Sequence, residues 1–223
     1  MRPRQRRPVA LRLIFRRLLR ACGPQGWWPA RSPFEMMVGA LLTQATNWHN
    51  VERAIVRLAD AGGLRPRGVL VLRRGEVERA VRPAGYFRQK AKQVVGFARW
   101  FVRRYGGSPR RMFRTPWRAL RQELLSLHGI GPETADSILL YAGGQPVFVV
   151  DAYTRRIFRR HRLMPARATY DEVQQFAMRE LPVSSRVYNE FHALLVAVGK
   201  RFCHRRHPDC SRCPLGELPH TVR

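Results

Sequence analysis

Apolar residues in this chain recur mostly three or four positions apart, which is the spacing of amphipathic helices. The pattern predicts helices over residues 34–42, 51–58, 76–81, 89–105, 116–127, 134–142, 151–161, 170–180 and 184–198. Glycine and proline clusters such as Gly62-Gly63 and Gly106-Gly107 separate them. Val147 to Val150 is the one β-branched run, and it is too isolated to build a sheet. The sequence therefore predicts an all-α fold.

The start of the chain is strongly basic. Arginine alternates with apolar residues from Arg2 to Arg20, and no acidic residue precedes Glu35. In a helix, one face would carry Leu11, Ile14, Phe15, Leu18 and Leu19. We favour a basic first helix lying against a phosphate backbone, although a mitochondrial transit segment has a similar composition. No apolar run is long enough to span a bilayer, so a membrane is not an expected partner.

Charge extends this picture to the whole chain. Its 42 basic and 15 acidic residues give a formal net charge of +27 over 223 residues, which favours a polyanionic partner, nucleic acid before a membrane surface. Arginine supplies all of the basic residues except Lys90, Lys92 and Lys200, a bias that a GC-rich genome explains in part. Four clustered cysteines are too few for a secreted disulfide framework.

The sequence between residues 127 and 136 carries the most specific motif, Leu-His-Gly-Ile-Gly-Pro-Glu-Thr-Ala-Asp. Two glycines around one apolar residue permit positive φ and a tight turn between two helices. Pro132 suits the first position of the second helix, where its missing N–H costs nothing. The free N–H groups of that helix start form an anion site suited to a phosphate. An ordinary αα-hairpin with a glycine turn is the alternative.

Together with Val149-Val150-Asp151, this string resembles the helix-hairpin-helix DNA glycosylases of the endonuclease III superfamily, over residues 26–218. The resemblance implies an all-α, two-lobed fold with the active-site cleft between the lobes. A six-helix barrel with the hairpin would span residues 33–145. Residues 1–32 and 146–223 would form the second helical lobe, with an iron–sulfur-type loop at 203–220. The implied partner is double-stranded DNA with damaged bases, bound by a monomer in a bacterial cytoplasm at the nucleoid; mitochondrial or nuclear locations are alternatives.

The resemblance implies that Asp151 and Glu133 are catalytic. An ionised Asp151 at a helix start could stabilise an oxocarbenium-like transition state and position water, or it could simply cap the helix. Bifunctional members of the superfamily carry a lysine where Glu133 stands, and glutamate cannot form an imine. AP-lyase activity is therefore not expected. Lys90 and Lys92 are expected to contact phosphate or to lie on a solvated face, whereas Lys200 could approach the cleft. Asp136 is explained by the helix dipole alone.

Aromatic residues suggest the substrate. The Trp27-Trp28-Pro29 run and Trp48 are similar to 3-methyladenine glycosylases of this superfamily, in which such aromatics sandwich a flipped purine. Because N-alkylated purines are cationic, indole rings attract them more than neutral bases. Core packing is the alternative reading of these tryptophans.

Further roles are implied by the resemblance alone. Lys200 would join the base pocket and pair with Glu133, Gln44 would fill the gap left by the base, and Tyr86 would wedge into the opposite strand. The remaining DNA contacts would come from the hairpin residues Gly129, Ile130, Gly131 and Thr134.

The C-terminal cysteines follow the spacing of the endonuclease III iron–sulfur loop, with Cys203, Cys210 and Cys213 as three ligands. Pro219 stands where the fourth cysteine belongs, and His220 follows it. A [4Fe-4S] cluster completed by a histidine or an exogenous ligand is favoured. Zinc held by three cysteines and a histidine, or a loop without metal, are the alternatives. Cys22 is expected to be a buried free thiol and stays open as a fourth ligand.

The sequence thus predicts a monofunctional DNA N-glycosylase of base excision repair that flips and removes alkylated purines. An endonuclease III-like pyrimidine or mismatch glycosylase is one alternative. A non-catalytic DNA-binding homologue, which keeps the hairpin and the basic surface, is another.

Overall fold

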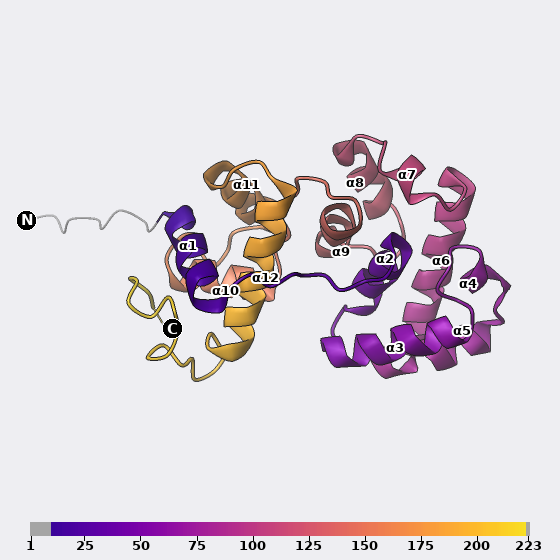
Figure 1. The fold of residues 1–223 in the computed structure, drawn as a ribbon, viewed down its shortest axis with the longest axis horizontal. Coiled ribbons are helices and arrows are strands. Elements are labelled where there is room, and N and C mark those ends of the chain that lie inside the picture. The colour runs from indigo at the N-terminus through magenta and orange to yellow at the C-terminus, as the bar shows by residue number, and fades with distance from the viewer. Residues whose placement is uncertain (1–9, 222–223) are drawn as a thin grey trace, which may run out of the picture. The chain divides into compact units, whose positions relative to one another are not determined.

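A computed structural model describes residues 10–221 of the chain. Every regular element in that range is helical and none is a strand, which confirms the predicted all-α fold (Figure 1). Residues 147–150 are extended and fully buried without pairing into a sheet, as their isolation predicted. Part of the arginine-rich start, residues 1–9, lies outside the described range.

The described residues divide into two compact units, each with its own core. One unit combines the residues up to Trp27 with those from Pro146 onward. Its helices are α1 (Leu11–Cys22), α10 (Ala152–Arg160), α11 (Tyr170–Glu180) and α12 (Ser185–Arg201). Helix α1 packs on α12 and α11 and buries Leu11, Ile14 and Leu18, which lie on its predicted apolar face (Figure 1).

The second unit runs from Trp28 to Gln145. Its long helices are α2 (Pro33–Leu42), α3 (Trp48–Asp60), α5 (Arg74–Val81), α6 (Phe87–Tyr105) and α8 (Trp117–Leu125). Its shorter elements are α4 (Gly68–Val71), a 3-10 turn (Arg82–Ala84), α7 (Pro109–Met112), α9 (Pro132–Ser137) and a π-helical segment (Ile138–Ala142). Stacked rings of Phe34, Phe97 and Phe101 hold α2 against α6.

Local sequence signals explain most helix starts. The Ser32 hydroxyl accepts a hydrogen bond from Glu35 N at 3.1 Å, with Pro33 in the first turn of α2. Thr169 and Glu172 form a reciprocal capping box at α11. The prediction of one regular helix over residues 134–142 is wrong in one respect: from Ile138 onward the segment is a π-helix. A π segment changes the angular position of the residues that follow it.

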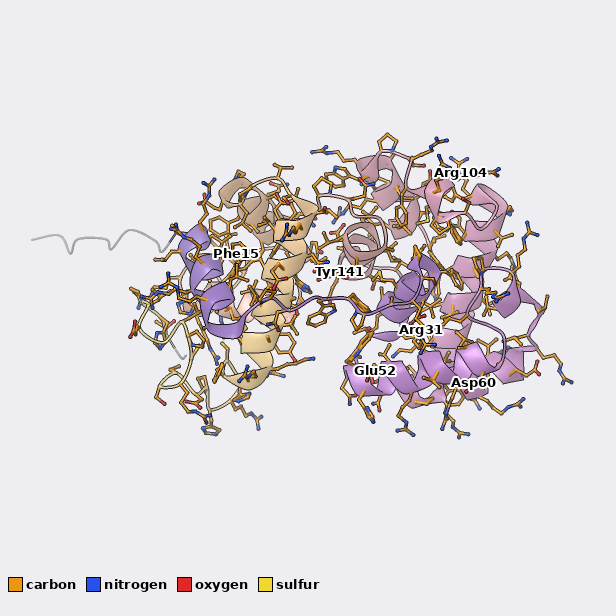
Figure 2. All side chains as sticks on the ribbon, viewed as in Figure 1. Phe15, Arg31, Glu52, Asp60, Arg104 and Tyr141 are labelled. Atoms are coloured by element: carbon orange, nitrogen blue, oxygen red, sulfur yellow. The ribbon has the colours of Figure 1, made fainter. Side chains whose placement is uncertain are left out.

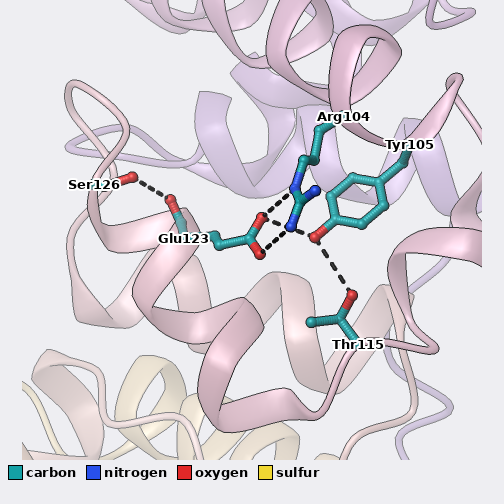
Figure 3. A network of polar contacts seen from close by, with 5 residues as sticks. All are labelled: Arg104, Tyr105, Thr115, Glu123 and Ser126. Carbon is teal, nitrogen blue, oxygen red and sulfur yellow. Dashed lines mark hydrogen bonds and ion pairs between the residues drawn. The ribbon is translucent and has the colours of Figure 1, made fainter.

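A polar network attaches the end of α6 to α8, the helix that leads into the glycine turn (Figure 3). The Tyr105 hydroxyl donates to Glu123 Oε2 at 2.8 Å, and the Arg104 guanidinium lies 3.4 Å from the same carboxylate. Ser126 Oγ donates to the Glu123 carbonyl at 2.7 Å, so the last turn of α8 is tied down as well. These contacts fix one arm of the hairpin to the longest helix of its unit.

Arginine dominates the surface of both units. Figure 2 shows many side chains that end in nitrogen along the outline of both units, among them Arg104, beside acidic residues such as Glu52 and Asp60. Among residues 10–221, no helix is both long and apolar enough to cross a bilayer.

Candidate functional site

The two glycines of the hairpin have different conformations. Gly129 has φ +79°, a conformation in which an L side chain is strained, and a Cβ there would also collide with the Gln93 side chain, so glycine is favoured. Gly131 instead caps α9 with φ −92° and ψ 178°, an extended geometry open to any residue. Of the two glycines that permit positive φ, only Gly129 therefore adopts it. A Cβ at Gly131 would meet no atom within 4 Å, so the helix start is open there.

Gln44 connects the loop after α2 to the hairpin. Its Nε2 donates to the Gly129 carbonyl at 2.9 Å and to Thr134 Oγ1 at 3.0 Å. Thr134 is 6% exposed, and Ile130 is equally buried. In this hairpin, therefore, Gly129 and Gly131 are the exposed predicted contact residues, whereas the side chains of Ile130 and Thr134 point inward.

Lys90 corrects an expectation from the sequence. It does not face solvent or a phosphate: it is 3% exposed, and its Nζ donates to three backbone carbonyls. The acceptors are the oxygens of Leu42 at 2.9 Å, Gln44 at 2.8 Å and Ala84 at 2.7 Å. Burial lowers the pKa of the Lys90 ammonium. Lys92, one of its neighbours on α6, is exposed as expected.

Tyr86 stands at the tip of the loop before α6. Its side chain is 71% exposed, and its φ of 44° places a non-glycine residue in the left-handed region. An exposed aromatic ring on a strained backbone is unusual for a residue with only a packing role. This geometry is compatible with the wedge role that the resemblance implies.

Two aromatic rings lie against Trp28. Trp48 meets it edge-on with ring centroids 4.9 Å apart, and the centroid of Tyr141 lies 5.2 Å from that of Trp28. All three side chains are only partly buried, while Pro29 is exposed. Trp48 Nε1 donates to Glu52 Oε1 at 2.7 Å, which fixes the orientation of its indole. Tyr141 was not predicted, because the π-helical turn that carries it has no sequence signal.

Asp151 and His192 form a buried pair in the other unit. Asp151 caps α10 through Oδ1, which accepts from Thr154 N at 2.7 Å, and its Oδ2 lies 3.7 Å from His192 Nε2. Asp151 is 8% exposed and His192 is 6% exposed. Burial lowers the pKa of His192, and the Asp151 carboxylate offsets part of that shift. Sequence reasoning missed His192, since a lone histidine on an apolar helix face resembles a packed core residue.

Trp27 and Lys200 belong to the same group of side chains. The Trp27 ring lies 6.3 Å from the His192 ring, and Lys200 Nζ stands 5.7 Å from the centroid of the Trp27 ring. Trp27 and Trp28, adjacent in sequence, therefore fall in different units. Asp151, His192, Trp27 and Lys200 combine a carboxylate, an imidazole, an aromatic ring and an ammonium.

The two acidic residues of α9 lie in different surroundings. Glu133 is exposed in its first turn. Asp136 is fully buried, and its carboxylate receives two hydrogen bonds from Arg121, at 2.7 and 3.1 Å. This bidentate ion pair joins α8 to α9 across the glycine turn, which agrees with a structural role for Asp136.

The C-terminal loop brings the three predicted cysteine ligands around one small hollow. Cys203, Cys210 and Cys213 line it together with His220 and His161. Burial raises the pKa of the Cys213 thiol, and the neighbouring Cys203 and Cys210 raise it further. Within residues 10–221, no group of three or more His, Cys, Asp or Glu side chains is arranged to hold a metal ion. Cys22 lies outside the set of residues that line this hollow.

The surroundings of the hollow are rich in hydrogen-bond donors. The Arg160 guanidinium donates to Cys203 Sγ at 3.0 Å and to the His204 carbonyl at 2.8 Å. His220 Nδ1 lies 2.8 Å from the Leu218 carbonyl, which can only accept, so Nδ1 carries a proton and Nε2 is the nitrogen left to bind a metal. Metal-binding histidines have this arrangement. Sequence reasoning missed Arg160, one of many arginines without a distinguishing pattern.

Comparison with known proteins identifies the class of the chain. Residues 38–182 match the family described as HhH-GPD superfamily base excision DNA repair protein. The chain belongs to this family, which confirms the predicted endonuclease III superfamily and places it among enzymes that act on N-glycosidic bonds.

Individual relatives agree with this assignment. A protein of Methanocaldococcus jannaschii, named as a DNA repair glycosylase, is 42% identical over 207 residues, which cover 92% of this chain and 93% of the relative. Endonuclease III of Bacillus subtilis is 27% identical over 84% of this chain and 80% of its own length.

Solved structures share the fold. An endonuclease III in a non-covalent DNA complex has a TM-score of 0.80 at 23% identity and covers 94% of this chain and 93% of its own. The 3-methyladenine DNA glycosylase of H. pylori, bound to 1,N6-ethenoadenine, has a TM-score of 0.73 at 26% identity over 86% of this chain and 95% of its own.

Proposed function

We propose that this protein is a monofunctional DNA N-glycosylase that removes alkylated purines from double-stranded DNA. The observation that carries the proposal is Asp151, a carboxylate that is 8% exposed and lies 3.7 Å from His192. Within residues 10–221, no arginine or lysine side chain lies within ion-pair distance of it. Such a group can stabilise positive charge at the anomeric carbon of a nucleotide and orient a water for attack. The neutral His192 beside it leaves its negative charge available.

The absence of lyase chemistry follows from the lysines. Glu133 stands at the position of the imine-forming lysine and cannot form an imine. The ammonium of Lys90 is enclosed by three carbonyls, and Lys92 projects from α6. Lys200, next to Trp27, is the remaining amine near the proposed catalytic group.

The preference for alkylated purines rests on the partly exposed aromatic rings. The faces of Trp28, Trp48 and Tyr141 offer a π-rich surface to a cationic base, and Trp27 already holds a cation, Lys200, near its ring. A purine alkylated on a ring nitrogen leaves as a neutral base, so its departure needs no general acid. One carboxylate is then sufficient for the reaction.

DNA would be held by groups of the second unit. The open start of α9 at Gly131 offers backbone N–H donors to a phosphate with no side chain in the way. Gln44 lies next to this helix start, and the exposed Tyr86 would enter the duplex where a base has left. The site of action would be chromosomal DNA in the cytoplasm.

Duplexes that each carry one defined lesion test the proposal, with base release and strand cleavage scored separately. We expect release of 3-methyladenine, which is cationic in DNA, with strand breaks only after alkali and no borohydride-trapped adduct. A trapped adduct that disappears in Lys200→Met would contradict monofunctional action and identify the nucleophile. Release of oxidised or mismatched pyrimidines instead would establish the endonuclease III-like alternative. Lesion-independent binding without any release would indicate a non-catalytic homologue.

The hollow of the C-terminal loop is the proposed cluster site. Three thiols and an imidazole suit a [4Fe-4S] cluster, with Cys203, Cys210, Cys213 and His220 as ligands. When bound, the cluster would hold the loop together. The chain's own contribution is the Arg160 guanidinium, which donates a hydrogen bond to Cys203 Sγ and thereby orients this proposed ligand.

Metal content tests this assignment. Anaerobically purified protein should contain about four irons per chain, because each cubane cluster holds four. We expect His220→Ala to lose iron and visible absorbance, whereas Cys22→Ser, a thiol outside the hollow, should retain both. Loss of iron in Cys22→Ser with retention in His220→Ala would transfer the fourth ligand to Cys22. Stoichiometric zinc, or no metal, would reject the cluster.

A further inference from the structure

Lys90 joins the two loops that carry Gln44 and Tyr86. Its three acceptors are the last carbonyl of α2, the Gln44 carbonyl and the last carbonyl of the 3-10 turn before Gly85. An ammonium has three N–H donors, so every donor is used. The carbonyls at helix ends are also the groups that most favour a positive charge.

Both loops contain a residue in the left-handed region within two positions of a carbonyl that Lys90 contacts. Ala45, directly after Gln44, has φ 52°, and Tyr86 has φ 44°. Left-handed conformations of non-glycine residues persist only when the surroundings enforce them. Lys90 also lies one helical turn after Tyr86, and its backbone N–H donates to the Tyr86 carbonyl at 3.0 Å.

The same connection reaches the hairpin. Gln44 donates to Gly129 and Thr134, and Gln93, which lies three residues after Lys90, directs its Nε2 to the Gly129 carbonyl at 3.4 Å. Helix α6 thus supports three loops from one face, and Lys90 makes the shortest of its contacts with them.

We infer that Lys90 is a positioning residue that holds the Gln44 loop and the Tyr86 loop in register with each other. The inference rests on the proposed function, in which Gln44 fills the duplex and Tyr86 enters it. These two side chains must act on the same base pair together, so their relative placement sets the efficiency of flipping. Lys90 itself touches no DNA.

Amide hydrogen exchange tests the placement without DNA. In Lys90→Met, which keeps the length of the side chain and removes its donors, exchange at residues 44–46 and 85–87 should accelerate at least about tenfold. The matched control is Lys92→Met, the same substitution on an exposed neighbour. A uniform acceleration across the unit, or an equal effect in Lys92→Met, would overturn the inference. Lys90→Gln, which restores two N–H donors, serves if the methionine variant does not fold and should show a partial effect.

A kinetic cycle tests the functional part. Gln44→Ala and Tyr86→Ala should each slow single-turnover release in the wild-type background but have less than half that logarithmic effect in Lys90→Met. If Lys90 only stabilises the fold, Gln44→Ala and Tyr86→Ala should slow release by the same factor in Lys90→Met as in the wild type. That result would overturn the inference. If the wild type releases no base, the proposed function fails, and DNA affinity replaces the rate in the same cycle.

Discussion

Replacing Asp151 by Asn is expected to reduce base release by about 10³-fold or more, because the variant loses the carboxylate that is proposed to stabilise positive charge at the anomeric carbon. Asparagine has the same shape and keeps the oxygen that accepts from Thr154 N, so the cap of α10 should survive. The variant therefore separates the capping role from the catalytic role. Single-turnover release from an alkylated duplex is the measurement.

The matched control is Asp60→Asn, which changes the net charge by the same amount at an exposed position on α3. Both variants should bind undamaged DNA within about threefold of each other, because each removes one negative charge from a surface rich in arginine. Release by Asp151→Asn at the rate of Asp60→Asn would show that Asp151 only caps its helix.

Replacing Arg121 by Met is expected to lower the free energy of unfolding by about 3–5 kcal/mol, the typical cost of removing one partner of a buried ion pair. The Asp136 carboxylate would remain fully buried without its bidentate guanidinium. Urea unfolding measures the loss. The double variant Arg121→Met with Asp136→Leu should recover much of the stability, because apolar replacements remove the unpaired charge.

Arg104→Met provides the comparison. Arg104 and Glu123 also form an ion pair, between α6 and α8, but the Arg104 side chain is 61% exposed. The free energy of unfolding is therefore expected to fall by less than about 1 kcal/mol. An equal decrease in the free energy of unfolding in Arg104→Met and Arg121→Met would mean that burial does not determine how much these ion pairs stabilise the protein.

Sequence patterns located most of the helices for identifiable physical reasons. Apolar periodicity and caps such as Ser32 and Thr169 act within a few residues, so their signals are visible in the sequence. The four-residue helices α4 and α7 are too short to show a period, and they were not predicted. Nothing in residues 138–142 distinguishes a π-helix from an α-helix.

The candidate site was predictable only where a motif carries it. The hairpin, Asp151 and the cysteine spacing are local patterns, whereas Lys90, His192 and Arg160 each depend on at least one partner more than 30 residues away in sequence. A buried lysine is rare enough that surface exposure is the natural expectation. Only the three-dimensional contacts distinguish Lys90 from Lys92.

Gly131 has a consequence for how the hairpin can be altered. A Cβ at Gly131 would contact no other atom of the protein, whereas a Cβ at Gly129 would collide with Gln93. A methyl group placed at 131 would leave the interior undisturbed and meet only what approaches from outside. The fold itself therefore constrains Gly129, whereas a constraint on Gly131 would have to come from a molecule that binds there, as the proposed DNA contact would.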